Sequence, residues 1–237
     1  MKIINLIGKK GSGKTYIAGE LTKVLLSEGY TVYNATFAAK LKEIIAKYFG
    51  VRKNNFTNAI TNFDDIQTNV YNMLVKSGIK SKALVSLLND YKQIALNIKL
   101  MIYAKDSRSL MQYIGTEIFR KDDEEYWTRY MKIQLENLNK VFHINDNGYW
   151  EAKIDFAIIS DCRFINEFEM LNSLHNIKTY NLFISRLNID ETDNHQSEKE
   201  VEDILKFKNQ SIKIFNNVDD KQEFDIAIYG LVNLITA

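Results

Sequence analysis

Residues 2–15 of the chain read KIINLIGKKGSGKT, and this stretch decides the fold. Its first six residues form a short apolar run rich in β-branched side chains, which is typical of a buried strand. Residues 8–15 match the pattern G-x-x-x-x-G-K-[ST], whose glycines let successive backbone N–H groups converge on phosphate oxygens. Apolar residues with helical spacing follow over residues 14–27. The stretch therefore predicts a strand, a phosphate-binding loop and a helix, in that order.

The loop predicts a chemical role for its last two residues. Lys14 is expected to reach the β- and γ-phosphates of ATP, and the Thr15 hydroxyl is expected to ligate Mg²⁺. The residues predicted to bind phosphate are Gly8, Lys10, Gly11, Ser12, Gly13, Lys14 and Thr15. The alternative is a glycine-rich turn that matches the pattern by chance, but a strand and a helix flank it as the motif requires. By itself the loop indicates binding of a nucleoside triphosphate and leaves the reaction open.

Composition and charge narrow the class of protein. The 237 residues carry 31 Lys+Arg and 30 Asp+Glu, a net charge of +1. This balance removes the general electrostatic case for binding nucleic acid or an anionic membrane surface. One cysteine and three histidines argue against a disulfide and against a Cys- or His-based metal site. No apolar run approaches the roughly 18–20 residues that span a bilayer. We expect a cytoplasmic protein.

The rest of the chain alternates strand and helix signals. Further strands are predicted at residues 31–36, 154–160, 178–185 and 211–215, and further helices at residues 38–49, 165–174 and 222–235. This alternation predicts an α/β fold, a three-layer sandwich in which helices cover both faces of a parallel sheet of about five strands. Residues 141–151 are expected to form a loop.

The middle of the chain is expected to be helical. Between residues 51 and 105 no clear strand signal interrupts helical stretches at residues 65–75 and 82–104. Residues 107–138 form a long helical pattern that the charged run KDDEE can break. We expect residues 1–50 and 106–237 to form the core, and residues 51–105 to form a helical insertion lobe.

A carboxylate and an arginine follow the predicted strand at residues 154–160. In a parallel sheet the carboxyl ends of the strands face the ligand crevice. Asp161 is therefore a candidate for the Mg²⁺ shell beside Thr15, and Arg163 is a candidate for neutralising charge on a transferring phosphoryl group. The alternative is a solvated ion pair at the end of a strand. Cys162 between them has no histidine partner in sight and is expected to be packed rather than reactive.

A polar stripe runs along the predicted helix after residue 107. Arg108, Gln112, Thr116 and Arg120 are spaced by four, which on an α-helix gives one slanted stripe with a drift of about 40° per step. Arginine and glutamine donors near an aromatic plane suit a nucleotide base and phosphate. Trp127 follows as the candidate aromatic, although a tryptophan is more often part of a core. The alternative is a solvated helix face.

A charged loop is expected after the fourth strand. Residues 190–200 read DETDNHQSEKE and are short of apolar side chains. An exposed surface loop and a mobile lid over phosphates, near residues 186–203, both fit this composition. In the lid interpretation Arg186 is the charge donor. His195 has no partner pattern and is expected to make only local hydrogen bonds.

Taken together, these motifs resemble the bacteriophage deoxynucleoside monophosphate kinases, a branch of the P-loop nucleotide kinases. The resemblance rests on GKKGSGKT (8–15), FAAKLK (37–42), RSLMQYIGTEIFR (108–120) with Trp127, SDCRFINE (160–167) and HQSE (195–198). It implies transfer of the γ-phosphate of ATP to a deoxynucleoside monophosphate (dNMP). It also implies that residues 51–105 are a monophosphate-binding insertion and that Lys42, Arg108, Gln112, Thr116 and Trp127 form the dNMP site. It further implies catalysis by Lys14, Arg163 and Arg186 and, for a phage-encoded chain, the host cytoplasm.

Two other functions stay open at this point. One is another small-molecule kinase of the same fold, such as a relative of phosphomevalonate kinase. The other is an NTP-hydrolysing switch or DNA-processing ATPase, because one fold hosts many reactions. The resemblance favours small nucleotides as the binding partners. The oligomeric state is open, with a homodimer as one alternative.

Overall fold

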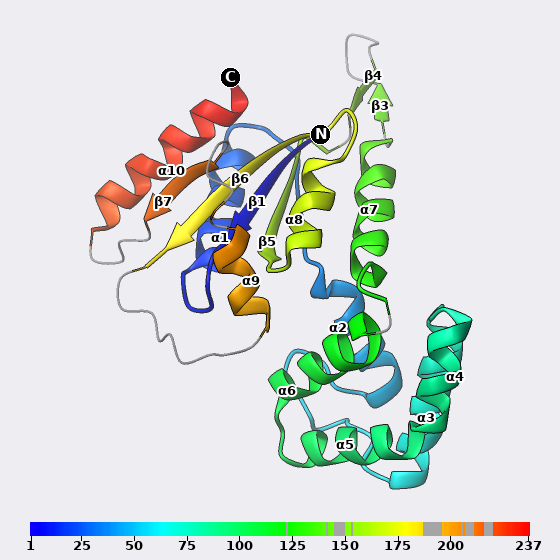
Figure 1. Ribbon diagram of the computed structural model, residues 1–237. Coiled ribbons are helices and arrows are strands. Elements are labelled where there is room, and N and C mark those ends of the chain that lie inside the picture. The colour runs from blue at the N-terminus through cyan, green and yellow to red at the C-terminus, as the bar shows by residue number, and fades with distance from the viewer. Residues whose placement is uncertain are drawn as a thin grey trace. The chain divides into compact units, whose positions relative to one another are not determined.

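The computed structural model describes all residues except 122, 141, 145–149, 153, 187–195, 205, 207–210 and 216–219. The chain divides into two compact units, one formed by Met1–Phe37 with Met131–Ala237 and the other by Ala38–Tyr130 (Figure 1). The insertion lobe expected at residues 51–105 falls wholly within the second unit. Within the described part of the chain, no helix combines the length and the apolar character needed to cross a membrane.

The first unit is built on a parallel sheet of five strands, which confirms the predicted fold class. The spatial order of the strands is β2-β5-β1-β6-β7. Their bounds are Lys2–Ile7 for β1, Val32–Ala35 for β2, Phe156–Cys162 for β5, Lys178–Ser185 for β6 and Ser211–Phe215 for β7. Ile7 at the end of β1 pairs with Cys162 of β5 and with Phe183 of β6. The carboxyl ends of these three central strands therefore meet at one edge of the sheet.

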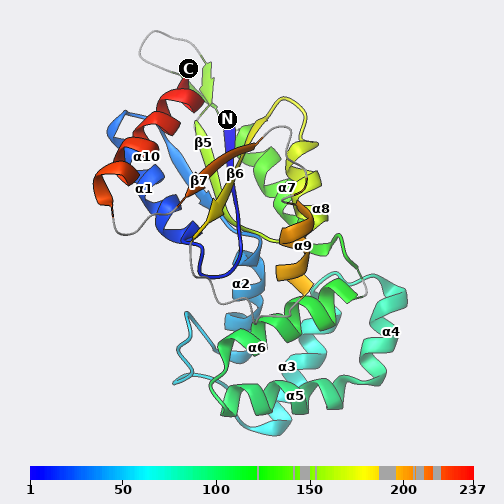
Figure 2. The ribbon, with the colours of Figure 1, turned by 60° about the vertical axis from the view of Figure 1, so that its left-hand side comes forward.

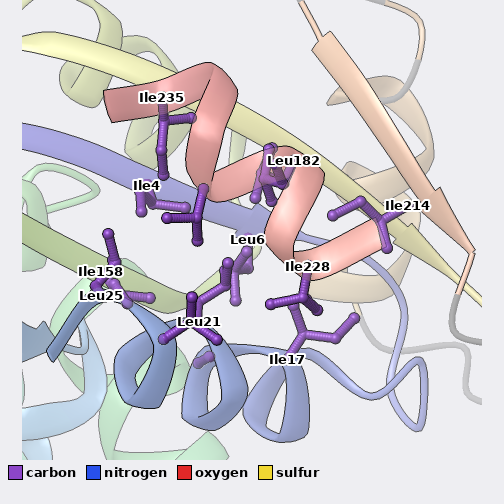
Figure 3. Close-up of a cluster of buried hydrophobic side chains, with 14 of the residues drawn as sticks. Ile4, Leu6, Ile17, Leu21, Leu25, Ile158, Leu182, Ile214, Ile228 and Ile235 are labelled. Carbon is purple, nitrogen blue, oxygen red and sulfur yellow. The ribbon is translucent and has the colours of Figure 1, made fainter. Parts of the chain in front are cut away.

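Helices α1 (Lys14–Ser27) and α10 (Lys221–Thr236) cover one face of this sheet (Figure 2). Ile4 and Leu6 of β1 point to them because alternate residues of a strand face the same side. Figure 3 shows these two side chains packed among those of α1, α10 and the neighbouring strands. This cluster, with Ile17, Leu21 and Leu182 fully buried, is the apolar core under the loop of residues 8–15.

The other face of the sheet carries a buried chain of amides under α8 (Ile165–Asn172). Asn5 of β1 donates from Nδ2 to Asn181 Oδ1 of β6 at 2.9 Å, and Asn181 donates to Asn172 Oδ1 of α8 at 2.8 Å. Asn5 and Asn181 are 0% and 3% exposed, and they are directly paired across the strands. These bonds link two strands and a helix, so α8 lies on the face opposite α1 and the sheet is covered on both sides.

Three expectations for the first unit are corrected. Strand β5 runs to Cys162 instead of ending at Ser160, so Asp161 lies within the strand. Residues 141–151 are not only a loop, because β3 (Phe142–Ile144) and β4 (Trp150–Ala152) pair antiparallel. The charged loop is interrupted by helix α9 (Gln196–Ile204), while residues 190–195 and His195 lie outside the described residues. Helix α9 forms because Val201 and Ile204 are both fully buried.

The second unit is helical. Its elements are α2 (Ala38–Phe49), α3 (Phe63–Lys76), α4 (Ser81–Asn89), α5 (Tyr91–Tyr103), α6 (Ser107–Gln112), a π-helix, η1 (Tyr113–Arg120), and the start of α7 (Tyr126–Asn139). The single helix expected at residues 82–104 is therefore wrong, since it breaks at Asp90 into α4 and α5. The pattern expected at residues 107–138 does break near the run KDDEE, and its middle is π-helical instead of α-helical.

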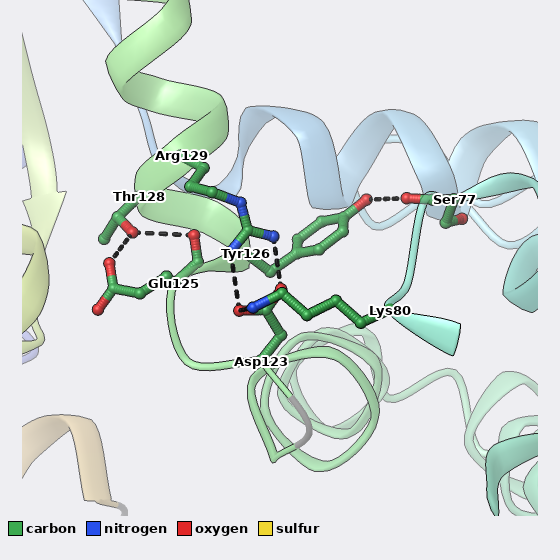
Figure 4. A network of polar contacts seen from close by, with 7 residues as sticks. All are labelled: Ser77, Lys80, Asp123, Glu125, Tyr126, Thr128 and Arg129. Atoms are coloured by element: carbon green, nitrogen blue, oxygen red, sulfur yellow. Dashed lines mark hydrogen bonds and ion pairs between the residues drawn. The ribbon is translucent and has the colours of Figure 1, made fainter. Parts of the chain in front are cut away.

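The connection from η1 to α7 is held by a network around Asp123 (Figure 4). Arg129 donates to both carboxylate oxygens of Asp123, at 2.9 and 2.5 Å, and Lys80 Nζ lies 3.5 Å from the same carboxylate. The Tyr126 hydroxyl donates to the Ser77 carbonyl oxygen at 2.7 Å. The side chain of Asp123 is only 4% exposed. The two charges and the bonds from Arg129 lower the pKa of Asp123.

This network predicts a stability that weakens in acid. A carboxyl whose pKa is lowered on folding adds stability above its unfolded pKa of about 3.9 and loses it as pH falls through the lower folded value. We expect Asp123→Asn to cost about 1–2 kcal/mol of unfolding free energy at pH 7 and to lessen the loss of stability below about pH 4. Glu43→Gln, which removes only the exposed pair with Lys40, is the control. Denaturant titrations at pH 7 and below about pH 4 measure the unfolding free energy of each variant. Equal losses of unfolding free energy in Asp123→Asn and Glu43→Gln would contradict the prediction.

Candidate functional site

The loop of residues 8–15 starts at the carboxyl edge of the sheet, where β1 and β6 lie too close for any residue but glycine. A Cβ atom on Gly8 would lie 2.3 Å from the carbonyl oxygen of Ile184 and 2.7 Å from Ser12 Oγ. Gly11 and Gly13 have φ values of 79° and 91°, in the left-handed region that favours glycine. Each of the three glycines of the motif is therefore required by backbone geometry.

Lys14 closes this loop in the structure. Its Nζ donates to the carbonyl oxygens of Gly8 at 2.5 Å and Lys9 at 2.7 Å, and lies 3.3 Å from Ser12 Oγ. Lys14 is 7% exposed and Ser12 is fully buried. A positive charge is thus held inside a ring of backbone, at the start of the 14-residue helix α1, whose N-terminus favours anions. Lys10 and Thr15 are exposed on either side of it.

Asp161 and Arg163 follow on the neighbouring strand, one residue either side of Cys162. Because Cys162 pairs with Ile7, Arg163 and Gly8 leave the sheet at the same edge. Asp161 Oδ1 accepts the backbone N–H of Phe37 at 2.9 Å, so this carboxylate also anchors the chain between β2 and α2. Both side chains are half-buried. Cys162 is fully buried, and burial raises the pKa of its thiol well above the ordinary value. Both observations agree with the expectation that Cys162 is packed rather than reactive.

Glu167 fixes the backbone that carries Arg163. It is 3% exposed, and its Oε2 accepts the N–H groups of Arg163 at 2.8 Å and Phe164 at 3.2 Å. This carboxylate satisfies backbone donors at the N-terminus of α8, in the manner of the glutamate in a capping box. Sequence reasoning assigned no role to Glu167. The sequence signal for a capping box is Ser, Thr, Asp or Asn at the N-cap, and Phe164 occupies that position here.

Two acidic side chains of helix α9 contact this edge of the sheet, one at the loop of residues 8–15 and one at the start of α8. Glu202 Oε1 lies 2.8 Å from Lys9 Nζ of the loop, and this contact lowers the pKa of Glu202. Glu200 Oε2 accepts the backbone N–H of Ile165 at 3.0 Å. Arg186, at the end of β6, is exposed. Half of the lid expected near residues 186–203, residues 187–195, lies outside the described residues, and the described half consists of Arg186 and α9 up to Asp203.

The residues expected to face the acceptor all belong to the second unit. Lys42 is exposed on α2, Arg108 and Gln112 are half-buried on α6, and Thr116 is half-buried on η1. Arg120, also of the stripe, is 7% exposed. The drift of about 40° per four residues holds only as far as Gln112, because π-helical turns from Tyr113 onward are wider. Asp106 begins α6 by accepting the Ser109 hydroxyl at 2.6 Å and the Ser109 N–H at 3.0 Å, and these two bonds lower the pKa of Asp106.

Trp127 is bound to the π-helix by its indole nitrogen. Nε1 donates to the carbonyl oxygen of Gly115 at 3.0 Å, and the ring packs against Phe119 and Tyr126 with centroid distances of 5.2 and 4.7 Å. Trp127 is 5% exposed, so little of its face is open to a base in this conformation. The room left by Gly115 is taken by a methyl group of Leu41, which a Cβ atom would approach to 2.8 Å.

The Mg²⁺ expectation rests on two oxygen donors. Thr15 and Asp161 present a hydroxyl and a carboxylate, the donor class that Mg²⁺ prefers, and Mg²⁺ takes its remaining ligands from phosphates and water. This donor set fits the ion. Within the described ranges, no group of three or more His, Cys, Asp or Glu residues forms a metal cluster.

Comparison with known proteins leaves the family open. No family model matches the sequence, and no curated protein matches it. One similar solved structure is a mutant of the Mycobacterium tuberculosis APS kinase CysC, with 11% sequence identity and a TM-score of 0.29. The match covers 86% of this chain and 94% of that one. A TM-score this low supports no conclusion about what this chain does.

Proposed function

We propose that the protein is an ATP-dependent kinase that phosphorylates deoxynucleoside monophosphates. The observation that carries the proposal is Lys14, held among the carbonyl oxygens of Gly8 and Lys9 at the N-terminus of α1. This arrangement presents one cation and several backbone N–H groups to a single phosphate chain. The sequence resemblance to phage dNMP kinases supports the choice of acceptor.

The donor half of the reaction is assigned to the first unit. Residues 8–15 would cradle the phosphates of ATP, and Lys14 would contact the group being transferred. Arg163 and Arg186, from the ends of β5 and β6, would neutralise charge that develops on that group. Thr15 and Asp161 would hold Mg²⁺, which offsets negative charge on the phosphates when bound. Catalysis in this scheme is positioning and charge neutralisation by fixed groups.

The acceptor half is assigned to the second unit, with Lys42, Arg108, Gln112 and Thr116 as the residues that bind dNMP. Arginine and glutamine offer the paired donors that suit a phosphate or a base edge. The π-helix supports this assignment, because such turns are frequently found at functional sites. A stacking role for Trp127 requires dNMP binding to uncover its ring for the base, and quenching of tryptophan fluorescence by the stacked base on adding dNMP would support that role.

Truncating a side chain of the polar stripe should weaken binding of the acceptor and leave binding of ATP nearly unchanged. We expect Arg108→Ala and Gln112→Ala each to raise the Kd for dNMP about ten- to a hundred-fold, because a charged or paired hydrogen bond is lost. The Kd for a non-hydrolysable ATP analogue should stay within about two-fold. Calorimetric titration of each variant with both ligands measures this. Lys82→Ala, an exposed lysine on α4, is the control in the same unit.

The reaction itself is tested by measuring ADP formation with each of the four dNMPs. Stimulation by one or more of them, with the dNDP recovered as product, supports the proposal. Stimulation by DNA or another macromolecule with release of inorganic phosphate would instead indicate an ATPase, the alternative from a different class. Turnover with a phosphorylated alcohol and none with dNMP would indicate a small-molecule kinase similar to phosphomevalonate kinase.

A further inference from the structure

Three consecutive backbone N–H groups, those of residues 163, 164 and 165, are all bound by carboxylates. Glu167 of α8 accepts from Arg163 and Phe164. Glu200 accepts from Ile165 at 3.0 Å. The first carboxylate is local, whereas the second comes from α9, 35 residues further along the chain. The turn that carries Arg163 is thus fastened from two different helices.

Helix α9 is well placed to hold this turn. Figures 1 and 2 both show it beside α8. Its apolar residues Val201 and Ile204 are fully buried, which fixes the helix by packing. Its acidic residue Glu202 pairs with Lys9, at 2.8 Å, so the same helix also touches the phosphate loop. The contact with the loop and the contact with the turn come from Glu202 and Glu200, two residues apart, which is about half a helical turn.

The charge arrangement explains why a carboxylate occupies this position. The first N–H groups of a helix have no partner within the helix, and the N-terminus favours negative charge. At α8 this demand is met by Glu167 and Glu200 together. A carboxylate acceptor forms a stronger bond to a backbone N–H than a neutral acceptor does. Removing Glu200 therefore loosens the Phe164–Ile165 peptide, one residue beyond Arg163, more than losing a neutral acceptor would.

We propose that Glu200 is a positioning residue, which holds the turn of residues 163–165 so that Arg163 is fixed at the phosphate site. This inference rests on the proposed kinase function only for its catalytic consequence. The hold on the turn itself is a property of the fold.

The hold on the turn is measured by hydrogen exchange of the backbone amides in the full chain. Glu200→Ala should speed exchange at Ile165 about ten-fold, while Glu200→Gln, which keeps an acceptor oxygen, should restore most of the protection. Asp203→Asn is the matched control, because Asp203 lies on the same helix and pairs with Lys206 on its surface. Equal exchange at Ile165 in Glu200→Ala and Asp203→Asn overturns the proposal.

The consequence for Arg163 is measured by a double-mutant cycle in kcat. In the wild-type background Glu200→Ala should lower kcat about ten-fold with the KM for ATP nearly unchanged, and Glu200→Gln should recover most of the loss. In the Arg163→Ala background the same change should cost less than about two-fold, because the group that it positions is already absent. A merely structural role of Glu200 predicts that kcat falls by the same factor in both backgrounds, and that result overturns the proposal.

The two kinds of failure are distinguishable. If the wild-type protein transfers phosphate to no dNMP, the proposed function is rejected, while the exchange rates still decide whether Glu200 holds the turn. If transfer occurs and the cycle is additive, the kinase function stands and the positioning role of Glu200 is rejected.

Discussion

Lys14→Met is expected to lower kcat by about 10²–10³-fold, the loss typical of removing one preorganised charge from a transition state. Methionine keeps most of the length and the apolar stem of lysine, so the change removes mainly the ammonium group. That group is enclosed by the carbonyl oxygens of Gly8 and Lys9, and it is 7% exposed. Steady-state kinetics with ATP and the best dNMP measure the loss.

The control for this variant is Lys23→Met on the same helix. Lys23 is exposed and pairs with Glu20, one turn away on the same helix. Its replacement should change kcat by less than two-fold and the melting temperature little. Lys14→Met with near-normal turnover and an intact fold would defeat the assignment of residues 8–15 to the transferred phosphate.

The parts of the fold that were predicted correctly are those where local pattern and tertiary burial agree. Strand β1, helices α1 and α2, and strands β6 and β7 have the bounds that their apolar spacing predicts. A glycine follows the pattern in β1, α1 and α2, and four consecutive residues of β6 are buried, so local sequence and core make the same demand. This agreement is why the five-stranded sheet could be predicted from the sequence.

The elements that sequence reasoning missed have only weak local patterns in the sequence. Helix α9 has only two buried apolar residues, Val201 and Ile204, in an otherwise charged segment. Hairpin strands β3 and β4 have three residues each, fewer than a periodic pattern needs. The π-helical turns of η1 keep the composition of an α-helix. Asp90 separates α4 from α5 without a glycine or proline to mark the break.

The candidate site was predicted in the same uneven way. Gly8, Gly11, Gly13 and Lys14 lie within seven residues of sequence, and their backbone demands can be predicted from a motif. Glu167 and Glu200 both bind the turn of residues 163–165. Glu200 is 35 residues away from Ile165 in the sequence, and no motif marks Glu200. The Asp161 contact with Phe37 likewise joins residues 124 positions apart. Long-range carboxylate contacts of this kind are visible only once the sheet places the strand ends together.

Arg163→Ala is expected to reduce kcat and kcat/KM together, by about 10²-fold, because a charge acting mainly in the transition state is lost. The alternative is a solvated ion pair at the strand end, which would affect stability and leave the kinetics unchanged. The structure makes these outcomes separable, since Glu167 accepts the backbone N–H of Arg163. Truncation to alanine keeps that N–H, so the turn and the start of α8 should survive.

Three variants complete this test. Arg163→Lys keeps the charge without the planar guanidinium and should recover part of the rate, because lysine binds a phosphoryl oxygen only as a point charge. Glu167→Ala removes the cap and keeps the guanidinium, so its main effect should be on unfolding free energy, about 1–2 kcal/mol. Arg52→Ala, an exposed arginine of the second unit, controls for loss of net charge. If Arg163→Ala unfolds more easily but turns over at the wild-type rate, Arg163 belongs to the scaffold and the developing charge must be neutralised by Lys14 and Arg186.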